Sequence, residues 1–341
     1  MAAQKRIVWL DAAKGFAILL VVAGHVFSGD LHAGMFPQQA AALDLICRVI
    51  YAFHMPLFFL LSGYVYQTAY FGGEHRHKAR RLQTLNLAAV FLLFSVGFGL
   101  CKVLLRRYTN ADVTLADVAL VWLKPIPPYW YLYVLCICCM LFAPDFLRKK
   151  PYLTLGVCIL LGQLGALLPA RIGEYFALAQ LLSHLPYFWL GVLLCEGKCD
   201  VLLRMPVLAA GALLSGLLTV LLRNTPGAYQ RIPVCNLLIA CGIAMPVFAL
   251  FRRLAVREGR LLTRLFCLLG RHSLEIFLLH SVFTAGCRVL LPLLGITGCA
   301  EAILCNVLLS TAVSLGLAVF CQKMGIREMI FQPVKYSYRK Q

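Results

Sequence analysis

The sequence predicts an all-α, polytopic membrane protein. Of its 341 residues, 61% are hydrophobic and only 13% are charged, whereas soluble domains average about 45–50% apolar and about 25% charged residues. Apolar stretches long enough to cross a bilayer recur along the chain. We expect about ten spans, near residues 8–27, 48–69, 85–104, 129–143, 152–169, 175–195, 206–222, 233–251, 265–283 and 300–321.

The distribution of Lys and Arg predicts the orientation of these spans. With a cytoplasmic N-terminus, the segments on the inside hold 21 of the 32 Lys and Arg residues, and the outside loops hold 9. Because cytoplasmic loops carry an excess of positive charge, we predict an N-in, C-in topology, with residues 28–44 and 105–128 outside and residues 70–84 inside. The net charge of +18 then reflects topology, and we expect no nucleic-acid partner because no soluble basic surface is predicted.

The cysteines indicate neither a disulfide framework nor a metal site. The fifteen Cys residues fall mostly inside apolar spans, without paired spacing in the outside loops, and a buried Cys usually behaves as a small hydrophobic residue. Since no long linker or repeat divides the chain, we expect one integral-membrane domain over residues 1–341, which ends in a basic cytoplasmic tail of about twenty residues.

Three ionisable residues share one face of the first predicted span. Asp11 and Lys14 are three residues apart, and Lys14 and His25 are eleven apart, which is about 20° from alignment and about 16 Å along a helix. Ionisable groups inside a membrane are costly and usually face the protein interior or a wet cavity. Snorkelling at a helix end explains Asp11 and Lys14 but not His25, so we interpret the stripe as functional.

The second predicted span contains a histidine next to a proline. Residues 53–64 read FHMPLFFLLSGY. Pro56 should break or bend the helix, and Ser62 with Gly63 permits close approach of another helix. Two interpretations of His54 remain open, a buried and hydrogen-bonded packing residue or a site residue.

A basic cluster precedes the third span, where residues 75–82 read HRHKARRL. Lys78, Arg80 and Arg81 are explained either as topogenic charge or contact with membrane lipid headgroups at the cytoplasmic face, or as a phosphate site, because Arg side chains match phosphate oxygens.

Aromatic residues begin the fourth predicted span, where YWYLY follows three prolines. Trp130 belongs either to an interfacial aromatic belt or to the wall of a sugar site, on which a pyranose face would stack.

The ninth predicted span contains GRHSLEIFLLH, residues 270–280. Ser273 and His280 are seven residues apart and share a helix face, whereas Glu275 is rotated by about 140° from His280. Glu275 is an intramembrane carboxylate and therefore a candidate for an ion pair or a substrate pathway. We expect three further acids to be solvated in or near outside loops: Asp30, Asp44 and Glu174.

Taken together, these motifs resemble those of the integral-membrane acyltransferase family 3. Lys14 to His25 is similar to the family's pattern of a basic residue, ten residues and a His, with Lys in place of the commoner Arg. The segments FHMPLFFLLSG, KARRL, YWYLYVL and GRHSLEIFLLH resemble its later motifs, but the proline-aromatic segment usual after KARRL is missing. The resemblance covers essentially the whole chain.

The resemblance implies a multi-pass O-acyltransferase of the bacterial cytoplasmic membrane. Its donor is acetyl-CoA or another short acyl-CoA, used as a substrate with no permanently bound cofactor, and its acceptor is a hydroxyl of a sugar, glycolipid or surface polysaccharide. In this mechanism, His25 acts as general base, and His54 either binds the acceptor or stabilises charge at the thioester carbonyl. The expected donor-binding residues are Lys14, Lys78, Arg80 and Arg81, and the expected acceptor-binding residues are Asp11, Ser62, Trp130, Ser273, Glu275 and His280.

Two other classes remain open on the sequence. One is a polytopic transporter that uses its intramembrane His, Lys and Glu residues, and the other is a non-enzymatic export partner in polysaccharide assembly. The oligomeric state is not predicted.

Overall fold

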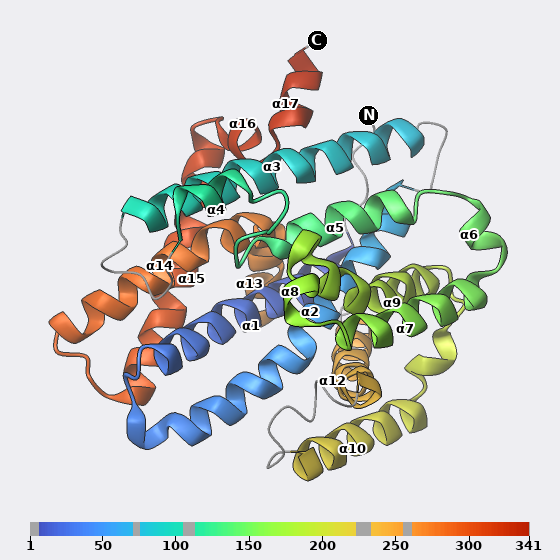
Figure 1. The fold of residues 1–341 in the computed structure, drawn as a ribbon, viewed down its shortest axis with the longest axis horizontal. Coiled ribbons are helices and arrows are strands. Elements are labelled where there is room, and N and C mark those ends of the chain that lie inside the picture. The colour runs from blue at the N-terminus through green and yellow to red at the C-terminus, as the bar shows by residue number, and fades with distance from the viewer. Residues whose placement is uncertain (1–6, 71–75, 105–112, 223–232, 255–260, 341) are drawn as a thin grey trace. The chain divides into compact units, whose positions relative to one another are not determined.

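The computed structural model in Figure 1 describes residues 7–70, 76–104, 113–222, 233–254 and 261–340. Within these ranges the chain forms helices and no strands, and eight helices are long and apolar enough to cross a membrane. The all-α, multi-pass prediction is therefore confirmed. The eight are α1 (Val8–His32), α2 (Ala40–Tyr70), α3 (Arg76–Leu104), α9 (Leu178–Cys195), α10 (Met205–Leu222), α12 (Pro233–Leu254), α14 (Ser273–Leu293) and α15 (Cys299–Lys323).

Two shorter apolar helices occupy the fourth and fifth predicted spans, α5 (Trp130–Leu141) and α7 (Pro151–Ala166). At 12 and 16 residues, they are shorter than the about 20 residues that usually cross a bilayer, so the count of about ten stays a prediction. The other short elements are η1 (Pro37–Gln39), α4 (Leu115–Ala119), α6 (Phe146–Lys149), α8 (Ala170–Gly173), η3 (Tyr175–Ala177), η4 (Asp200–Leu203), α13 (Leu261–Arg271), α16 (Arg327–Phe331) and α17 (Pro333–Lys340).

The structure corrects one local prediction and narrows another. The predicted span 265–283 covers the end of α13 and the first half of α14, because the chain leaves the helix at His272 and restarts at Ser273. Of the break or bend predicted at Pro56, the break is excluded, since α2 is helical on both sides of this residue. Parts of the predicted loops 70–84 and 105–128, namely residues 71–75 and 105–112, lie outside the described residues.

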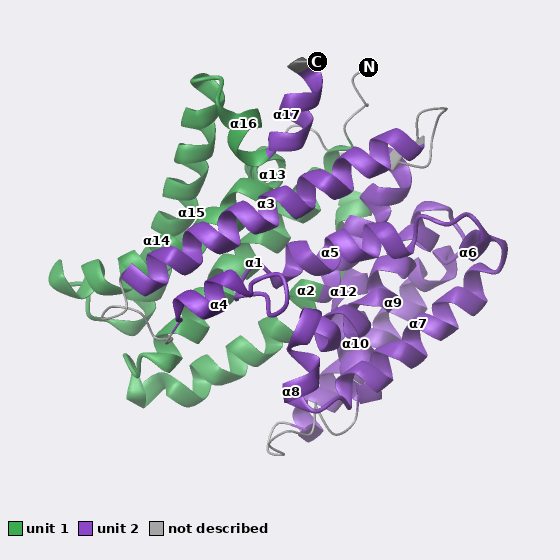
Figure 2. Ribbon diagram, turned by 45° about the horizontal axis from the view of Figure 1, so that its top comes forward, with its two compact units in different colours: residues 1–55, 247–331 green, residues 56–246, 332–341 purple. Residues whose placement is uncertain are grey.

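The chain divides into two compact units, which Figure 2 shows in separate colours. Unit 1 consists of residues 1–55 and 247–331, and unit 2 consists of residues 56–246 and 332–341. The division falls inside α2 and α12, next to Pro56 and Pro246.

In unit 1, glycines bring α1 against α13. A Cβ atom on Gly15 would overlap the backbone of Phe266, and a Cβ atom on Gly270 would overlap the backbone of Asp11. Small residues allow such close backbone approach between membrane helices. The helix that carries Asp11, Lys14 and His25 is thereby held along α13, and it also packs against α14 and α15.

Unit 2 has a second contact of the same kind. A Cβ atom on Gly63 would overlap the backbone of Phe188, and one on Gly191 in α9 would overlap the backbone of Leu60. The close approach predicted at Gly63 is confirmed. Elsewhere in this unit, α7 packs against α9, and α3 packs against α4, α5 and α17.

Candidate functional site

Four ring side chains of unit 1 form a group that we call the histidine cluster: His25, Tyr51, His54 and His280. The ring centroid of His25 lies 4.9 Å from that of His280 and 6.4 Å from that of Tyr51. The Tyr51 and His54 centroids are 5.0 Å apart. Residues from α1, α2 and α14, which are far apart in the sequence, thus meet within this unit.

Backbone carbonyls fix the tautomers of two of these histidines. His54 Nδ1 lies 2.7 Å from the Ile50 carbonyl oxygen, and His280 Nδ1 lies 2.8 Å from the Phe277 carbonyl oxygen. Because a carbonyl oxygen only accepts, each Nδ1 carries the hydrogen and each neutral ring has an unprotonated Nε2. Ser281 Oγ, 3.3 Å from His280 Nε2, therefore acts as a donor to it. As neutral rings, His54 and His280 offer an acceptor at Nε2 and no donor there.

The predicted stripe lies on one uninterrupted helix. Asp11, Lys14 and His25 are all within α1, and all three are half-buried. Asp11 Oδ2 lies 3.9 Å from Arg271 Nε. Next to His25, Gly24 leaves room for Tyr51, because a Cβ atom there would lie 3.2 Å from a Tyr51 ring carbon.

Glu275 forms a buried ion pair. Its side chain is 2% exposed, and Arg327 of α16 donates to Glu275 Oε1 from Nε at 2.6 Å and from Nη2 at 2.5 Å. His272 Nδ1 lies 3.9 Å from the same oxygen. Of the two roles foreseen for Glu275, the ion pair is present. Ser273 is the first residue of α14 and is half-buried, seven residues before His280 on the same helix.

The expected solvation of the three other acids is wrong for one of them. Asp30 is buried, and its Oδ1 accepts a hydrogen bond from Arg288 Nε at 2.8 Å. Arg288 of α14 thus compensates the negative charge of this carboxylate. The sequence of α1 alone does not reveal a partner on another helix. Asp44 and Glu174 have side chains that are 47% and 51% exposed, and the Glu174 carboxylate raises the pKa of Lys124, 2.5 Å away.

Unit 2 contains a second candidate region, which we call the basic pocket. It has a volume of about 380 Å³ and lies between α3 and α17. The lining residues are Lys78, Arg81, Leu82, Leu85, Val334, Ser337 and Tyr338. Lys78 Nζ lies 4.8 Å from the Tyr338 ring centroid, which is a cation–π distance. The C-terminal tail, expected to be only a charged extension, supplies one wall.

Arg80 does not line the basic pocket, although it belongs to the same sequence motif. Its side chain is buried, and it donates from Nη1 to the Ala143 carbonyl oxygen at 2.9 Å and from Nη2 to His77 Nδ1 at 2.7 Å. The contact with Ala143 ties α3 to the end of α5, whereas the contact with His77 lies within α3.

The remaining expected acceptor residues lie elsewhere in unit 2. Ser62 Oγ is 2.8 Å from the Tyr131 hydroxyl. Trp130 is half-buried, with its ring centroid 5.3 Å from His184 and 6.4 Å from Phe59. The structure does not place Ser62 or Trp130 among the residues of either the histidine cluster or the basic pocket.

Three residues that lie beside expected site residues were missed in the sequence. Tyr51 precedes His54 by three residues, so helical spacing could have found it. His184 is an intramembrane histidine, which is itself a signal. Tyr338 carried no signal, since only the fold brings it to Lys78. In the described part of the chain, no group of three or more His, Cys, Asp or Glu residues could hold a metal ion.

The similarity of the chain to a known protein family bears on both regions. The model Acyl_transf_3, described as an acyltransferase domain, matches residues 7–322. The match includes the whole histidine cluster and the α3 side of the basic pocket, but not α17. No curated protein matches the chain, and no solved structure matches it either.

Proposed function

Because the chain belongs to acyltransferase family 3, we propose that it transfers an acetyl or other short acyl group from acyl-CoA to a hydroxyl of a sugar, glycolipid or surface polysaccharide. The observation that carries this proposal is the histidine cluster, in which His25 of the α1 stripe lies 4.9 Å from His280. An imidazole has the pKa range for proton transfer near neutral pH.

In this mechanism His25 is the general base. It takes the proton of the acceptor hydroxyl while the hydroxyl oxygen attacks the thioester carbonyl carbon. The carbon–sulfur bond then breaks, and the CoA thiolate takes the proton from His25. Atoms and charge balance without a further reactant.

The position of the ring hydrogen of His54 decides which of its two expected roles we propose. With hydrogen on Nδ1, neutral His54 accepts at Nε2 and cannot donate there to an oxyanion. Of the two roles expected for it, we therefore assign acceptor binding, in which the acceptor hydroxyl donates to His54 Nε2.

We assign the donor's phosphates to the basic pocket. Lys78 and Arg81 are exposed cations that line it, and cations bind phosphate oxygens. Arg80 is left out because its guanidinium bonds to Ala143 and His77. Lys14, at the opposite end of the α1 stripe from His25, is proposed to contact the donor as well.

A transfer assay on the purified full chain tests the proposed function. The protein is reconstituted in vesicles with radiolabelled acetyl-CoA and a panel of sugar and glycolipid acceptors. Free CoA thiol and labelled acceptor should appear in equal amounts. Accumulation of label inside the vesicles without CoA release would indicate a transporter, and no reaction with any acceptor would leave the chain as a non-enzymatic partner. Both results would contradict the proposal.

We also propose the N-in, C-in orientation in the bacterial cytoplasmic membrane, on the basis of the 21 and 9 Lys and Arg residues. Single cysteines at positions 149 and 174, in a cysteine-free background, allow a test with an impermeant thiol reagent. Intact cells should label position 174 and not position 149. The reverse pattern would invert the topology.

A further inference from the structure

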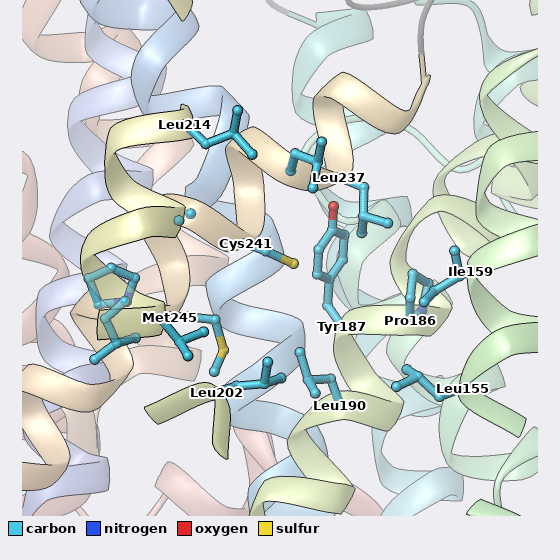
Figure 3. Close-up of a pocket in the computed structure, with 16 residues that line it drawn as sticks. Leu155, Ile159, Pro186, Tyr187, Leu190, Leu202, Leu214, Leu237, Cys241 and Met245 are labelled. Atoms are coloured by element: carbon cyan, nitrogen blue, oxygen red, sulfur yellow. The ribbon is translucent and has the colours of Figure 1, made fainter. Parts of the chain in front are cut away.

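Unit 2 contains an apolar pocket that the proposed transfer reaction does not use. Its volume is about 280 Å³, near the lower end of the range for small-ligand sites. It is shown in Figure 3 and is formed by α7, α9, η4, α10 and α12. The lining residues are Leu155, Ile159, Pro186, Tyr187, Leu190, Leu202, Val207, Leu208, Gly211, Leu214, Leu237, Leu238, Cys241, Gly242, Met245 and Pro246.

The lining predicts a hydrocarbon occupant. A bound water needs two to four polar partners, and the only side chains here with a polar atom are those of Tyr187 and Cys241 and the weakly polar Met245. An empty space would deprive the lining of dispersion contacts. Because α9, α10 and α12 are candidate membrane spans, the surrounding medium supplies hydrocarbon chains.

The Tyr187 hydroxyl indicates that the occupant also carries an oxygen acceptor. Tyr187 is only 6% exposed, and in Figure 3 its ring stands in the pocket with its oxygen toward Leu237 and its edge beside Cys241. Across the residues that the structure describes, no protein group forms a hydrogen bond with this hydroxyl. A donor left without a partner in apolar surroundings is costly, so a ligand oxygen in the pocket would relieve this cost.

Because the lining carries no positive charge, the hydrogen-bond acceptor of the occupant should be electrically neutral. No Lys, Arg or His lines the pocket, and a phosphate or carboxylate buried without a cation would be strongly disfavoured. An ester carbonyl is neutral and only accepts. We propose that this pocket binds one acyl chain of a glycerolipid, with the ester carbonyl accepting a hydrogen bond from Tyr187.

Photolabelling tests the site in the full chain. The protein is placed in vesicles of phosphatidylethanolamine and phosphatidylglycerol that contain a trace of phosphatidylethanolamine with a diazirine on one acyl chain. Adducts mapped by mass spectrometry should fall on peptides that contain Tyr187 and Cys241. Adducts confined to the exposed faces of the helices would overturn the proposal.

A pair of α10 variants supplies a matched control. Leu214 lines the pocket and Leu217 does not, and both are well exposed, at 41% and 55%. Leu214→Trp should fill the pocket and abolish the adducts, whereas Leu217→Trp should leave them unchanged. Equal labelling of the two variants, both with wild-type thermal unfolding, would contradict the assignment.

The hydrogen bond is tested without altering the shape of the pocket. Unlabelled ester lipid should displace the probe more effectively than the matched ether lipid, which lacks the carbonyl, by about 2- to 10-fold, the range for one net hydrogen bond. Tyr187→Phe should remove this difference. Equal competition by the two lipids in the wild-type protein, or stronger competition by a polyprenyl phosphate, would overturn the ester assignment whatever the folding of any variant.

Discussion

The histidine cluster and the basic pocket assemble functional groups in opposite ways. The cluster takes rings from three membrane helices, and backbone carbonyls fix the orientation of His54 and His280. The pocket places the exposed, flexible side chains of Lys78 and Arg81 beside a C-terminal helix. Proton transfer needs fixed geometry, whereas phosphate binding tolerates the freedom of long cationic side chains. The difference suggests that the two regions serve different steps.

The largest effect is expected for a variant of His25, which should change the rate of acyl transfer without changing the affinity for the donor. His25→Ala should lower the transfer rate by about 10²–10⁴-fold, the usual contribution of a positioned acid or base, and should leave acyl-CoA affinity unchanged. Initial rates of labelled acetyl transfer measure the first quantity, and calorimetric titration measures the second.

The matched control for this variant lies on the same helix. His32 is exposed at the end of α1, and its Nδ1 also bonds to its own helix, at Ser28. His32→Ala should keep full activity. A folded His25→Ala protein with more than half of the wild-type rate would refute the role of His25.

The next largest effect tests whether the Glu275–Arg327 ion pair stabilises the part of unit 1 that holds the histidine cluster. Glu275→Ala leaves Arg327 without its carboxylate on the helix that carries His280. Removing one partner of a buried pair costs about 3–5 kcal/mol, and because Arg327 keeps 24% exposure we expect a loss of about 2–3 kcal/mol in the free energy of unfolding.

Denaturation in mixed micelles measures the effect of Glu275→Ala. The control is Asp44→Ala, which removes an exposed ion pair with Arg48 and should cost less than about 0.5 kcal/mol. If the two variants had the same free energy of unfolding, the Glu275–Arg327 pair would not stabilise the protein more than an exposed ion pair does.

The same contrast explains what could be predicted from the sequence. Helical spacing places Lys14 and His25 on one face, and hydropathy identifies α1, so this helix and its polar stripe were predictable from local pattern. The meeting of His25 with His280, 255 positions away, depends on tertiary packing, in which Gly15 and Gly270 bring α1 against α13. Spacing could not reveal it.

The surroundings of Asp30 and Arg80 were not predictable for the same reason. Asp30 looked like a loop acid because its partner, Arg288, lies on another helix. Arg80 and Arg81 are adjacent in one basic motif, but their side chains leave α3 about 100° apart. One therefore reaches the end of α5 and the other lines the pocket.

A smaller effect is expected in the basic pocket. The double variant Lys78→Ala and Arg81→Ala should raise the KM for acyl-CoA by about 10- to 100-fold, because charge-assisted hydrogen bonds contribute about 1.5–3 kcal/mol each when well formed and less at exposed positions. The kcat should stay near the wild-type value. The wild-type KM should rise with added salt, and the salt dependence should be weaker in the variant.

A charge-matched control removes two other cations of unit 2. Lys149 and Lys150 are exposed and do not line the basic pocket, so Lys149→Ala with Lys150→Ala should leave the KM unchanged. If both double variants raised the KM equally, general positive charge rather than the pocket would attract the donor.

The smallest effect concerns Tyr338, which the family match does not include. Its ring lies 4.8 Å from Lys78 Nζ, and an exposed cation–π contact contributes about 0.5–1 kcal/mol. If this contact positions Lys78 for the donor, Tyr338→Ala should raise the Kd for acyl-CoA by about 2- to 5-fold, and Tyr338→Phe should not. In a Lys78→Ala background, Tyr338→Ala should not raise the Kd further, because the amino group that Tyr338 positions is absent. Titration of acyl-CoA into the four proteins completes this cycle. Additive effects would show that Tyr338 contacts the donor itself, as a stacking surface for the adenine base.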